Sequence, residues 1–445
     1  MNLVRIPFNS KMPLRLCIAW LLCTLVFTLL LFLISFIPRS MIADNLSEST
    51  RILQEEGLYQ NPRGSDQTWQ SDNFTSAIML NIMGTSLPGS MSDVLLAPRV
   101  AVGDSLEDMS LNSLSVVADG ADENAPIINY PRYWHGYEIL LKPLLVFFNI
   151  NQIRQLALIA TTTLSTILAV QFAQKRGIAT SLSITVPLVG FNIVVVCQGL
   201  SLVMTFLVGL LASVLLGATK KWWLQDWRVL IVPAFLCGAI TNYLDFLCTP
   251  LIALGLPLLT VVTYSFDSET MGRSPLEILK LCLVLSIAWA CGYGLLWVTK
   301  WLLCTLVTGY DALGDAMGAA SMRTSTSGGE LSQSISRLDA LKRNVNFAFP
   351  WWSKVIILAG CIAALASLIL LLRKKNHQER RIVISLTVGC AFIAMLPIVW
   401  YLALSQHSYV HTWFTYRNLM LCVNALLLYL SVAIPMIKSG TTRAS

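Results

Sequence analysis

Long apolar runs separated by short polar segments dominate this chain. The first run extends from Leu14 to Ile37 and is almost continuously apolar. Its length matches the roughly 20 residues that a helix needs to cross about 30 Å of hydrocarbon. Three basic residues, Arg5, Lys11 and Arg15, precede its apolar core, and no small-residue cleavage motif precedes the first polar residues after it. The pattern therefore predicts an uncleaved signal anchor that spans a membrane.

Further apolar runs bring the expected number of spans to about ten. They cover Ile153 to Phe172, Ile178 to Val196, Leu200 to Leu216, Val229 to Leu247, Leu251 to Tyr264, Ile278 to Thr299, Trp352 to Leu372, Ile382 to Leu404 and Leu419 to Ile437. Two long polar stretches interrupt them, which gives five sections: 1–37, 38–152, 153–300, 301–350 and 351–445. We expect an all-α polytopic membrane protein with a large external loop after its first helix and interfacial helices.

The basic residues indicate how the spans are oriented. Alternating the sides of the short loops places every strong basic cluster in the cytoplasm, as the positive-inside rule requires, and leaves both termini there. These residues are Arg5, Lys11, Arg15, Lys175, Arg176, Lys220, Lys221, Arg228, Arg273, Arg373, Lys374, Lys375, Arg380, Arg381, Lys438 and Arg443. The scheme requires that Tyr137 to Phe148, which contains Lys142-Pro143, forms a helix at the outer surface. Eleven spans with a different C-terminal side is the alternative.

Composition restricts the class and the compartment. Hydrophobic residues make up 55% of the chain and charged residues 12%, so a soluble fold is excluded. The net charge of +7 comes from residues at the ends of spans, which gives no reason to expect a nucleic-acid partner. None of the eleven cysteines lies between Pro38 and Asn151, and no metal-ligand or phosphate-loop motif occurs. We expect a bacterial cytoplasmic membrane protein without a cofactor.

Two acidic residues of the external loop are candidates for catalysis. The loop carries thirteen acidic and five basic residues between Pro38 and His135. Asp44 follows the first span closely, where a carboxylate can remove a proton from an incoming hydroxyl group. Asp72 is the second candidate. The alternative for each is a helix cap, Asp44 for a short helix that reaches Leu53 and Asp72 for a helix over 76–83.

The segment 130–137 combines aromatic rings with Arg132, Tyr133 and His135. Aromatic faces stack on sugar rings, and arginine or histidine can neutralise a phosphate group, so the segment suits a polyprenyl-phosphate-linked sugar. An aromatic belt with a snorkelling arginine is the alternative. Asp245 is a further candidate because a carboxylate within an apolar segment usually faces a cavity or a partner; closing the turn to Pro250 is its alternative role.

Between Leu331 and Val345, apolar residues recur at spacings of three and four, which predicts an interfacial amphipathic helix. A possible capping box, Ser327 to Glu330, precedes it. The basic residues of this helix would contact a lipid-linked phosphate or ordinary anionic headgroups; they are Arg337, Lys342 and Arg343.

Near the C-terminus, His407 and His411 are four residues apart, the spacing of a metal site on one helical face, but no third ligand is evident. A divalent metal is therefore a minor alternative. Arg417 lies just inside the last span, where a guanidinium needs an anionic partner, a cavity or a route to the interface.

This arrangement resembles the GT-C class of integral membrane glycosyltransferases. The resemblance is carried by the cytoplasmic N-terminus, the first span, the external loop with Ile42-Ala43-Asp44-Asn45, and the following helices with short loops. It implies a polyprenyl-phosphate sugar donor, an envelope glycan, lipid or protein as acceptor, inversion at the anomeric carbon, and Asp44 as the base. The paired acids of several such families are absent. Segments 72–81, 130–137 and 407–417 are also similar to uncharacterised membrane proteins of Gram-positive bacteria, which implies no activity.

Two other functions remain open from the sequence. A transporter or flippase of a lipid-linked or small solute would show internal repeats and ionisable groups near the membrane midplane. A non-enzymatic envelope scaffold would use the acidic loop as its binding module. The lack of a clear internal repeat and the clustering of ionisable residues on the expected outer face speak against a transporter, whereas a scaffold predicts that a change at Asp44 leaves function intact.

Overall fold

The computed structural model describes residues 11–64, 66–120, 124–266, 273–374 and 376–441, and it is almost entirely helical. Eight of the described helical segments are long and apolar enough to cross a membrane, and two shorter apolar helices lie among them. The prediction of an all-α polytopic membrane protein is confirmed at this level. These segments are α1 (Met12–Ser35), α7 (Ile150–Arg176), α10 (Leu200–Ala218), Trp227–Leu244, which ends with α12 (Ile231–Leu244), α14 (Pro275–Thr308), α17 (Trp351–Leu372), α18 (His377–Ala403), and Thr412–Ile437, which includes most of α21 (Met420–Thr441).

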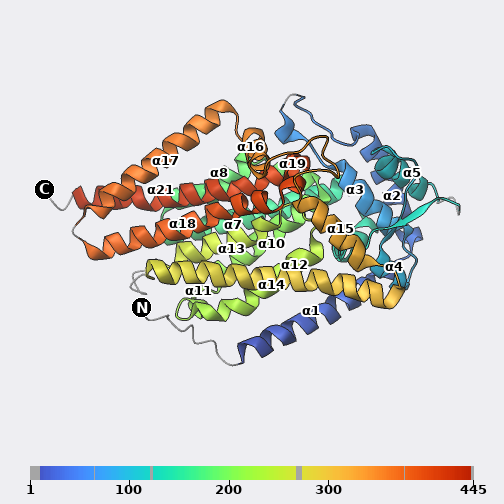
Figure 1. Ribbon diagram of the computed structural model, residues 1–445, viewed down its shortest axis with the longest axis horizontal. Coiled ribbons are helices and arrows are strands. Elements are labelled where there is room, and N and C mark those ends of the chain that lie inside the picture. The colour runs from blue at the N-terminus through green and yellow to red at the C-terminus, as the bar shows by residue number, and fades with distance from the viewer. Residues whose placement is uncertain (1–10, 65, 121–123, 267–272, 375, 442–445) are drawn as a thin grey trace.

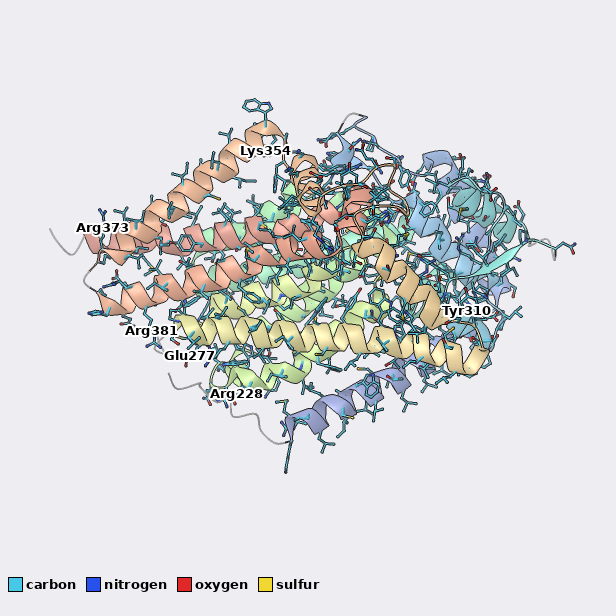
Figure 2. All side chains as sticks on the ribbon, in the orientation of Figure 1. Arg228, Glu277, Tyr310, Lys354, Arg373 and Arg381 are labelled. Atoms are coloured by element: carbon cyan, nitrogen blue, oxygen red, sulfur yellow. The ribbon has the colours of Figure 1, made fainter. Side chains whose placement is uncertain are left out.

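The long helices run side by side, and the elements that follow α1, among them α2 (Arg39–Glu56), α3 (Asn73–Thr85), α4 (Met91–Leu96) and α5 (Ser113–Ala118), gather at one end of them (Figure 1). Basic residues mark the other end, where Figure 2 shows Arg228, Arg373 and Arg381. This separation agrees with the predicted arrangement, in which the basic clusters lie at one end of the helices and the long polar loops lie at the other. Four residues used above for topology, Arg5, Lys375, Lys438 and Arg443, have side chains outside the described part of the chain.

The stretch 38–152 contains no candidate span among its described residues, and it folds into a helical unit. Helix α3 is its centre, because nearly every side chain from Ser76 to Gly84 is buried. A short antiparallel pair of strands places Arg99 opposite Ile128. The elements are α2 (Arg39–Glu56), α3 (Asn73–Thr85), α4 (Met91–Leu96), β1 (Pro98–Val100), α5 (Ser113–Ala118), β2 (Ile127–Asn129) and α6 (Glu138–Leu145). Helix α6 occupies the segment predicted to be a surface helix.

The second polar stretch forms α15 (Ala312–Thr324) and α16 (Arg337–Ala348). The amphipathic helix predicted from Leu331 exists, but it begins at Arg337. The predicted capping box at Ser327 is wrong, because Ser336 and Asp339 form the box instead. Ser336 Oγ accepts from the Asp339 amide at 3.2 Å, and the Asp339 carboxylate accepts from the Ser336 amide at 2.8 Å. Reciprocal bonds of this kind fix where a helix starts.

One predicted span is interrupted, and another ends three residues earlier than predicted. The run from Ile178 to Val196 divides into α8 (Ile178–Gly190) and α9 (Ile193–Gln198), because Asn192 adopts a left-handed conformation with φ of 57°. Helix α10 then starts at Leu200. Helix α12 ends at Leu244, and α13 (Pro250–Tyr264) begins after an irregular turn in which Leu247 has a φ of 63°. Irregular backbone among membrane helices requires partners inside the protein, since lipid offers none.

Two glycines allow α12 and α14 to cross at very short range. A Cβ atom added at Gly238 would lie 1.9 Å from the carbonyl oxygen of Trp289, and one added at Gly292 would lie 2.0 Å from that of Phe235. Small residues allow this approach in membrane bundles. The crossing fixes the C-terminal end of α12 relative to the aromatic residues of α14.

Candidate functional site

An aromatic stripe on α14 forms one wall of the candidate site. Trp289, Tyr293, Trp297 and Trp301 recur every fourth residue, so they share one helical face. Neighbouring rings along the stripe have centroids 5.1, 5.6 and 5.2 Å apart. The stripe lines a cavity of about 350 Å³ whose other lining residues come mainly from α15 and α18. Aromatic walls with a few polar groups are typical of ligand sites.

The charged groups of this cavity are two arginines, Arg132 and Arg323. The Arg132 backbone is held by the stripe, because its carbonyl oxygen accepts hydrogen bonds from Trp297 Nε1 at 2.6 Å and Trp301 Nε1 at 3.0 Å. Its side chain donates from Nε to Asp315 Oδ2 at 2.8 Å, which links the segment 130–137 to α15. Both arginines retain N–H groups suited to an anion.

Tyr133 connects the two sides of the cavity. Its buried ring stacks on Trp297, with centroids 6.1 Å apart, and the Arg323 guanidinium lies 5.7 Å from its centroid. The predicted aromatic and basic patch therefore faces the interior of the protein rather than forming an exposed belt. His135 has a structural position beside it: its Nε2 lies 2.7 Å from the Tyr130 carbonyl oxygen, and burial lowers its pKa to about 3.

Asp245 is the C-cap residue of α12 and is buried beside the stripe. Tyr293 donates its hydroxyl to Asp245 Oδ2 at 3.1 Å, and the Cys248 amide donates to Oδ1 at the same distance. The predicted turn-closing bond is confirmed. Asp245 also has a second role, because it joins the turn after α12 to α14.

The two histidines lie on α19 (Ser405–Val410) and just after it. Their rings are 4.9 Å apart, and His407 Nε2 lies 2.9 Å from the Leu247 carbonyl oxygen. Burial and the nearby Arg323 charge lower the pKa of His411 to about 4, so the ring is neutral near pH 7. Within the described residues, no group of three or more histidine, cysteine or acidic side chains is placed to hold a metal ion.

Asp72 lies within range of the Arg417 charge, although 345 positions separate the two residues in the sequence and no ion pair joins them in the described structure. Asp72 is the N-cap of α3, as one of the two hypotheses predicted: Oδ1 accepts from the Thr75 amide at 3.0 Å and Oδ2 from the Thr75 hydroxyl at 2.7 Å. Burial raises the pKa of this carboxyl group, and the bonds from Thr75 and the charge of Arg417 oppose the rise. Buried acids whose pKa is shifted by burial and by specific partners occur often at functional sites.

Arg417 is completely buried in the helical turn η5 (Tyr416–Leu419). It donates from Nη1 to the Trp413 carbonyl oxygen at 2.7 Å. Its Nε and Nη2 atoms have no hydrogen-bond partner among the described residues. Because unpaired buried donors are rare, a guanidinium with two of them beside a buried acid is a candidate functional group.

Asp44 is separate from this group. It lies in the second turn of α2, after an N-cap at Pro38, so neither the predicted cap nor a loop position is correct. Its side chain is exposed. Glu56, at the other end of the same helix, contacts Asn73 beside Asp72. Twelve residues of α-helix separate Asp44 from Glu56, about 18 Å along the axis at 1.5 Å per residue.

The basic residues of α16 are also outside the site. Arg337 donates to the Leu402 carbonyl oxygen at 2.6 Å, Lys342 pairs with Asp339 at 3.6 Å, and Arg343 stacks on Tyr409 at 4.3 Å. All three side chains are exposed. They therefore fit the surface role considered above better than a role in the cavity.

Sequence reasoning missed Arg323 and the aromatic stripe. The stripe had a readable signal, the fourfold repetition of aromatic residues from Trp289 to Trp301 within one apolar run. Arg323 had none, because its importance arises from the return of α15 across α14. No family model, curated protein or solved structure matches this chain.

Proposed function

We propose that the protein is a membrane glycosyltransferase that moves a sugar from a polyprenyl-phosphate donor to an acceptor of the cell envelope. The observation that supports it most is the aromatic cavity with Arg132 and Arg323 among its lining residues. An isoprenoid-linked phosphate needs both an apolar wall and cationic donors, and this cavity supplies both. The bacterial cytoplasmic membrane, with the site on its outer face, is part of the same proposal.

The reaction is a direct displacement at the anomeric carbon. The acceptor oxygen forms a bond to that carbon while the bond to the donor phosphate oxygen breaks, and the configuration inverts. The electron pair leaves with the polyprenyl phosphate, whose charge Arg323 and Arg132 stabilise. The proton of the acceptor hydroxyl goes to Asp72. Arg417 favours the ionised form of Asp72 through its positive charge.

Asp72 replaces Asp44 as the proposed base because of its surroundings. Asp72 is 1% exposed and lies within range of the Arg417 charge, whereas the Asp44 side chain is exposed and has no hydrogen bond or ion pair to any described residue. A buried carboxylate with a raised pKa is better matched to proton abstraction near neutral pH than a solvated one.

Sugar transfer in liposomes tests the proposal. Purified protein is reconstituted with a panel of polyprenyl-phosphate sugars, and wild type is compared with Asp72→Asn and Asp44→Asn at matched amounts. We expect transfer by wild type, loss of at least about a hundredfold in Asp72→Asn, and near-normal transfer in Asp44→Asn. Loss in Asp44→Asn alone would restore the assignment implied by the GT-C resemblance. No consumption of any donor would reject the glycosyltransferase.

A flippase for the same lipid is the second candidate, and the interrupted helices favour it. The breaks at Asn192 and Gly199 and the turn before α13 resemble the broken helices of transporters. The liposome assay separates the two functions, because a flippase moves labelled donor to the other leaflet without releasing its sugar.

A further inference from the structure

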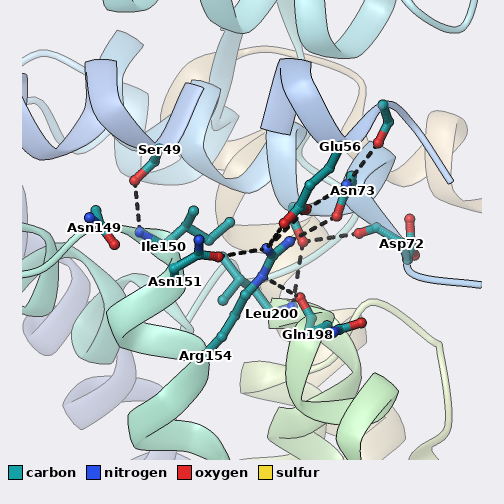
Figure 3. Close-up of polar contacts among 12 residues, drawn as sticks. Ser49, Glu56, Asp72, Asn73, Asn149, Ile150, Asn151, Arg154, Gln198 and Leu200 are labelled. Carbon is teal, nitrogen blue, oxygen red and sulfur yellow. Dashed lines mark hydrogen bonds and ion pairs between the residues drawn. The ribbon is translucent and has the colours of Figure 1, made fainter. Parts of the chain in front are cut away.

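A buried polar cluster connects the extramembrane unit to the helix break between α9 and α10. Figure 3 shows Arg154 of α7 pointing toward Glu56 and Asn73. Arg154 is 7% exposed, and its Nη1 lies 3.0 Å from each Glu56 carboxylate oxygen. Its Nη2 donates to Asn73 Oδ1 at 2.8 Å. One guanidinium thereby binds the end of α2 and the start of α3.

The other contacts of Arg154 reach the membrane helices. Its Nε donates to the Gln198 carbonyl oxygen at 2.9 Å, the last residue of α9. Across the break, the Leu200 amide at the start of α10 faces Ser76 Oγ of α3 at 3.5 Å. The backbone groups that the break leaves without helical partners thus bind Arg154 and Ser76 of α3. Irregular backbone among membrane helices requires such partners.

Asp72 adjoins these contacts through its neighbour Asn73 and through its own backbone oxygen. Its neighbour Asn73 donates to Glu56 Oε2 at 3.0 Å and to the Gly57 carbonyl oxygen at 2.7 Å. The backbone oxygen of Asp72 accepts from Ser76 Oγ at 3.0 Å. Both ends of the first turn of α3 are therefore fixed, one by Arg154 and Glu56 and the other by the helix break.

We infer that Arg154 and Glu56 are positioning residues that hold Asp72 against the membrane helices. Neither contacts the aromatic cavity, and both act through Asn73. A simple ion pair would join only Arg154 and Glu56. The Arg154 guanidinium instead uses all three of its nitrogens and joins α2, α3 and α9. The inference about catalysis rests on the proposed function; the inference about placement does not.

Hydrogen exchange in the reconstituted full-length protein tests the placement. The variants are Arg154→Gln and the milder Glu56→Gln, which keeps one acceptor oxygen, replaces the other with an amide nitrogen and lacks the charge. Arg51→Gln is the matched control, because Arg51 pairs with Glu48 and Glu55 on the exposed face of the same helix. We expect exchange in 57–76 to rise at least about tenfold in the first two variants and to stay unchanged in the control. Unchanged exchange in both variants would overturn the inference.

Transfer kinetics test the positioning role. For Glu56→Gln we expect kcat to fall roughly tenfold to a hundredfold with little change in the donor KM, since a displaced base slows chemistry more than binding. The acid limb of the pH profile should also move to lower pH, because a looser first turn of α3 admits water and relieves the burial that raises the pKa of Asp72. If Glu56→Gln only lowered the stability of the fold, the pH of the acid limb would stay unchanged. If wild type transfers no sugar, the proposed function fails, while the exchange result still decides the placement.

Discussion

The glycine crossing between α12 and α14 gives the most direct test of the packing. Replacing Gly238 or Gly292 by alanine adds a Cβ atom 1.9 or 2.0 Å from a backbone carbonyl oxygen of the opposite helix. Ordinary contact begins near 3.4 Å, so the helices must separate by about 1.5 Å. Backbone atoms cannot rotate away as a flexible side chain can. Overpacking of this kind costs about 1–3 kcal/mol, and sometimes more.

Gly294 supplies the control. It lies on the same helix, two residues after Gly292, and a Cβ atom there would meet nothing within 4 Å. Thermal unfolding of the purified protein in one detergent compares the three alanine variants. We expect lower midpoints for Gly238→Ala and Gly292→Ala and an unchanged or slightly higher midpoint for Gly294→Ala.

The separation also has a chemical consequence. Asp245 at the end of α12 and Tyr293 on α14 are joined by a single 3.1 Å hydrogen bond, which a 1.5 Å displacement would break. Activity should therefore fall in the two crossing variants even below their unfolding temperatures. If both crossing variants unfold at the temperature of wild type, the close approach of these helices is refuted.

Three further predictions concern single side chains. Burial raises the folded-state pKa of Asp72 above the ordinary value of about 3.9, so the contribution of Asp72 to stability is present below that pH and is lost as pH rises through the raised value. At pH 7.5, Asp72→Asn should therefore unfold at a higher temperature than wild type. A difference in unfolding temperature that does not shrink toward pH 4 would contradict this reasoning. Arg323→Gln should raise the donor KM, while Arg343→Gln on exposed α16 should not, as initial rates over a donor series will show. Ser336→Ala should lower the free energy of unfolding by about 1 kcal/mol through loss of the α16 cap, and an unchanged midpoint would count against the box.

The membrane helices could be predicted because their signal is local. An apolar run such as Trp352 to Leu372 has few alternatives, and α17 matches it within one residue. The exact ends of a helix are harder to predict where two capping motifs lie close together in the sequence. Ser327-Gly-Gly-Glu330 satisfies the capping pattern, but Gly328 and Gly329 adopt positive φ angles and make a turn instead. The later pair, Ser336 and Asp339, then starts the helix.

The site was less accessible because it depends on contacts between distant segments. Asp72, Tyr133, Asp245, His407 and Arg417 each stand out in the sequence by residue type and local context, and the structure buries all five. Asp44 was ranked first for its position after the first span. Sequence position did not reveal that α2 would direct its side chain to solvent, nor that Arg323 would enter the cavity.

The helix break between α9 and α10 also bears on the order of folding. Residues 39–118 are synthesised before α7 to α10, so α3 and Glu56 exist before the break emerges. Its unpaired carbonyl group at Gln198 can therefore meet Arg154 as soon as α9 forms. Domains that fold during synthesis generally do so in chain order. An early-folding extramembrane unit would thus act as an internal template for its own membrane bundle, and a delay in that unit would lead to misassembly of helices whose own sequences are intact.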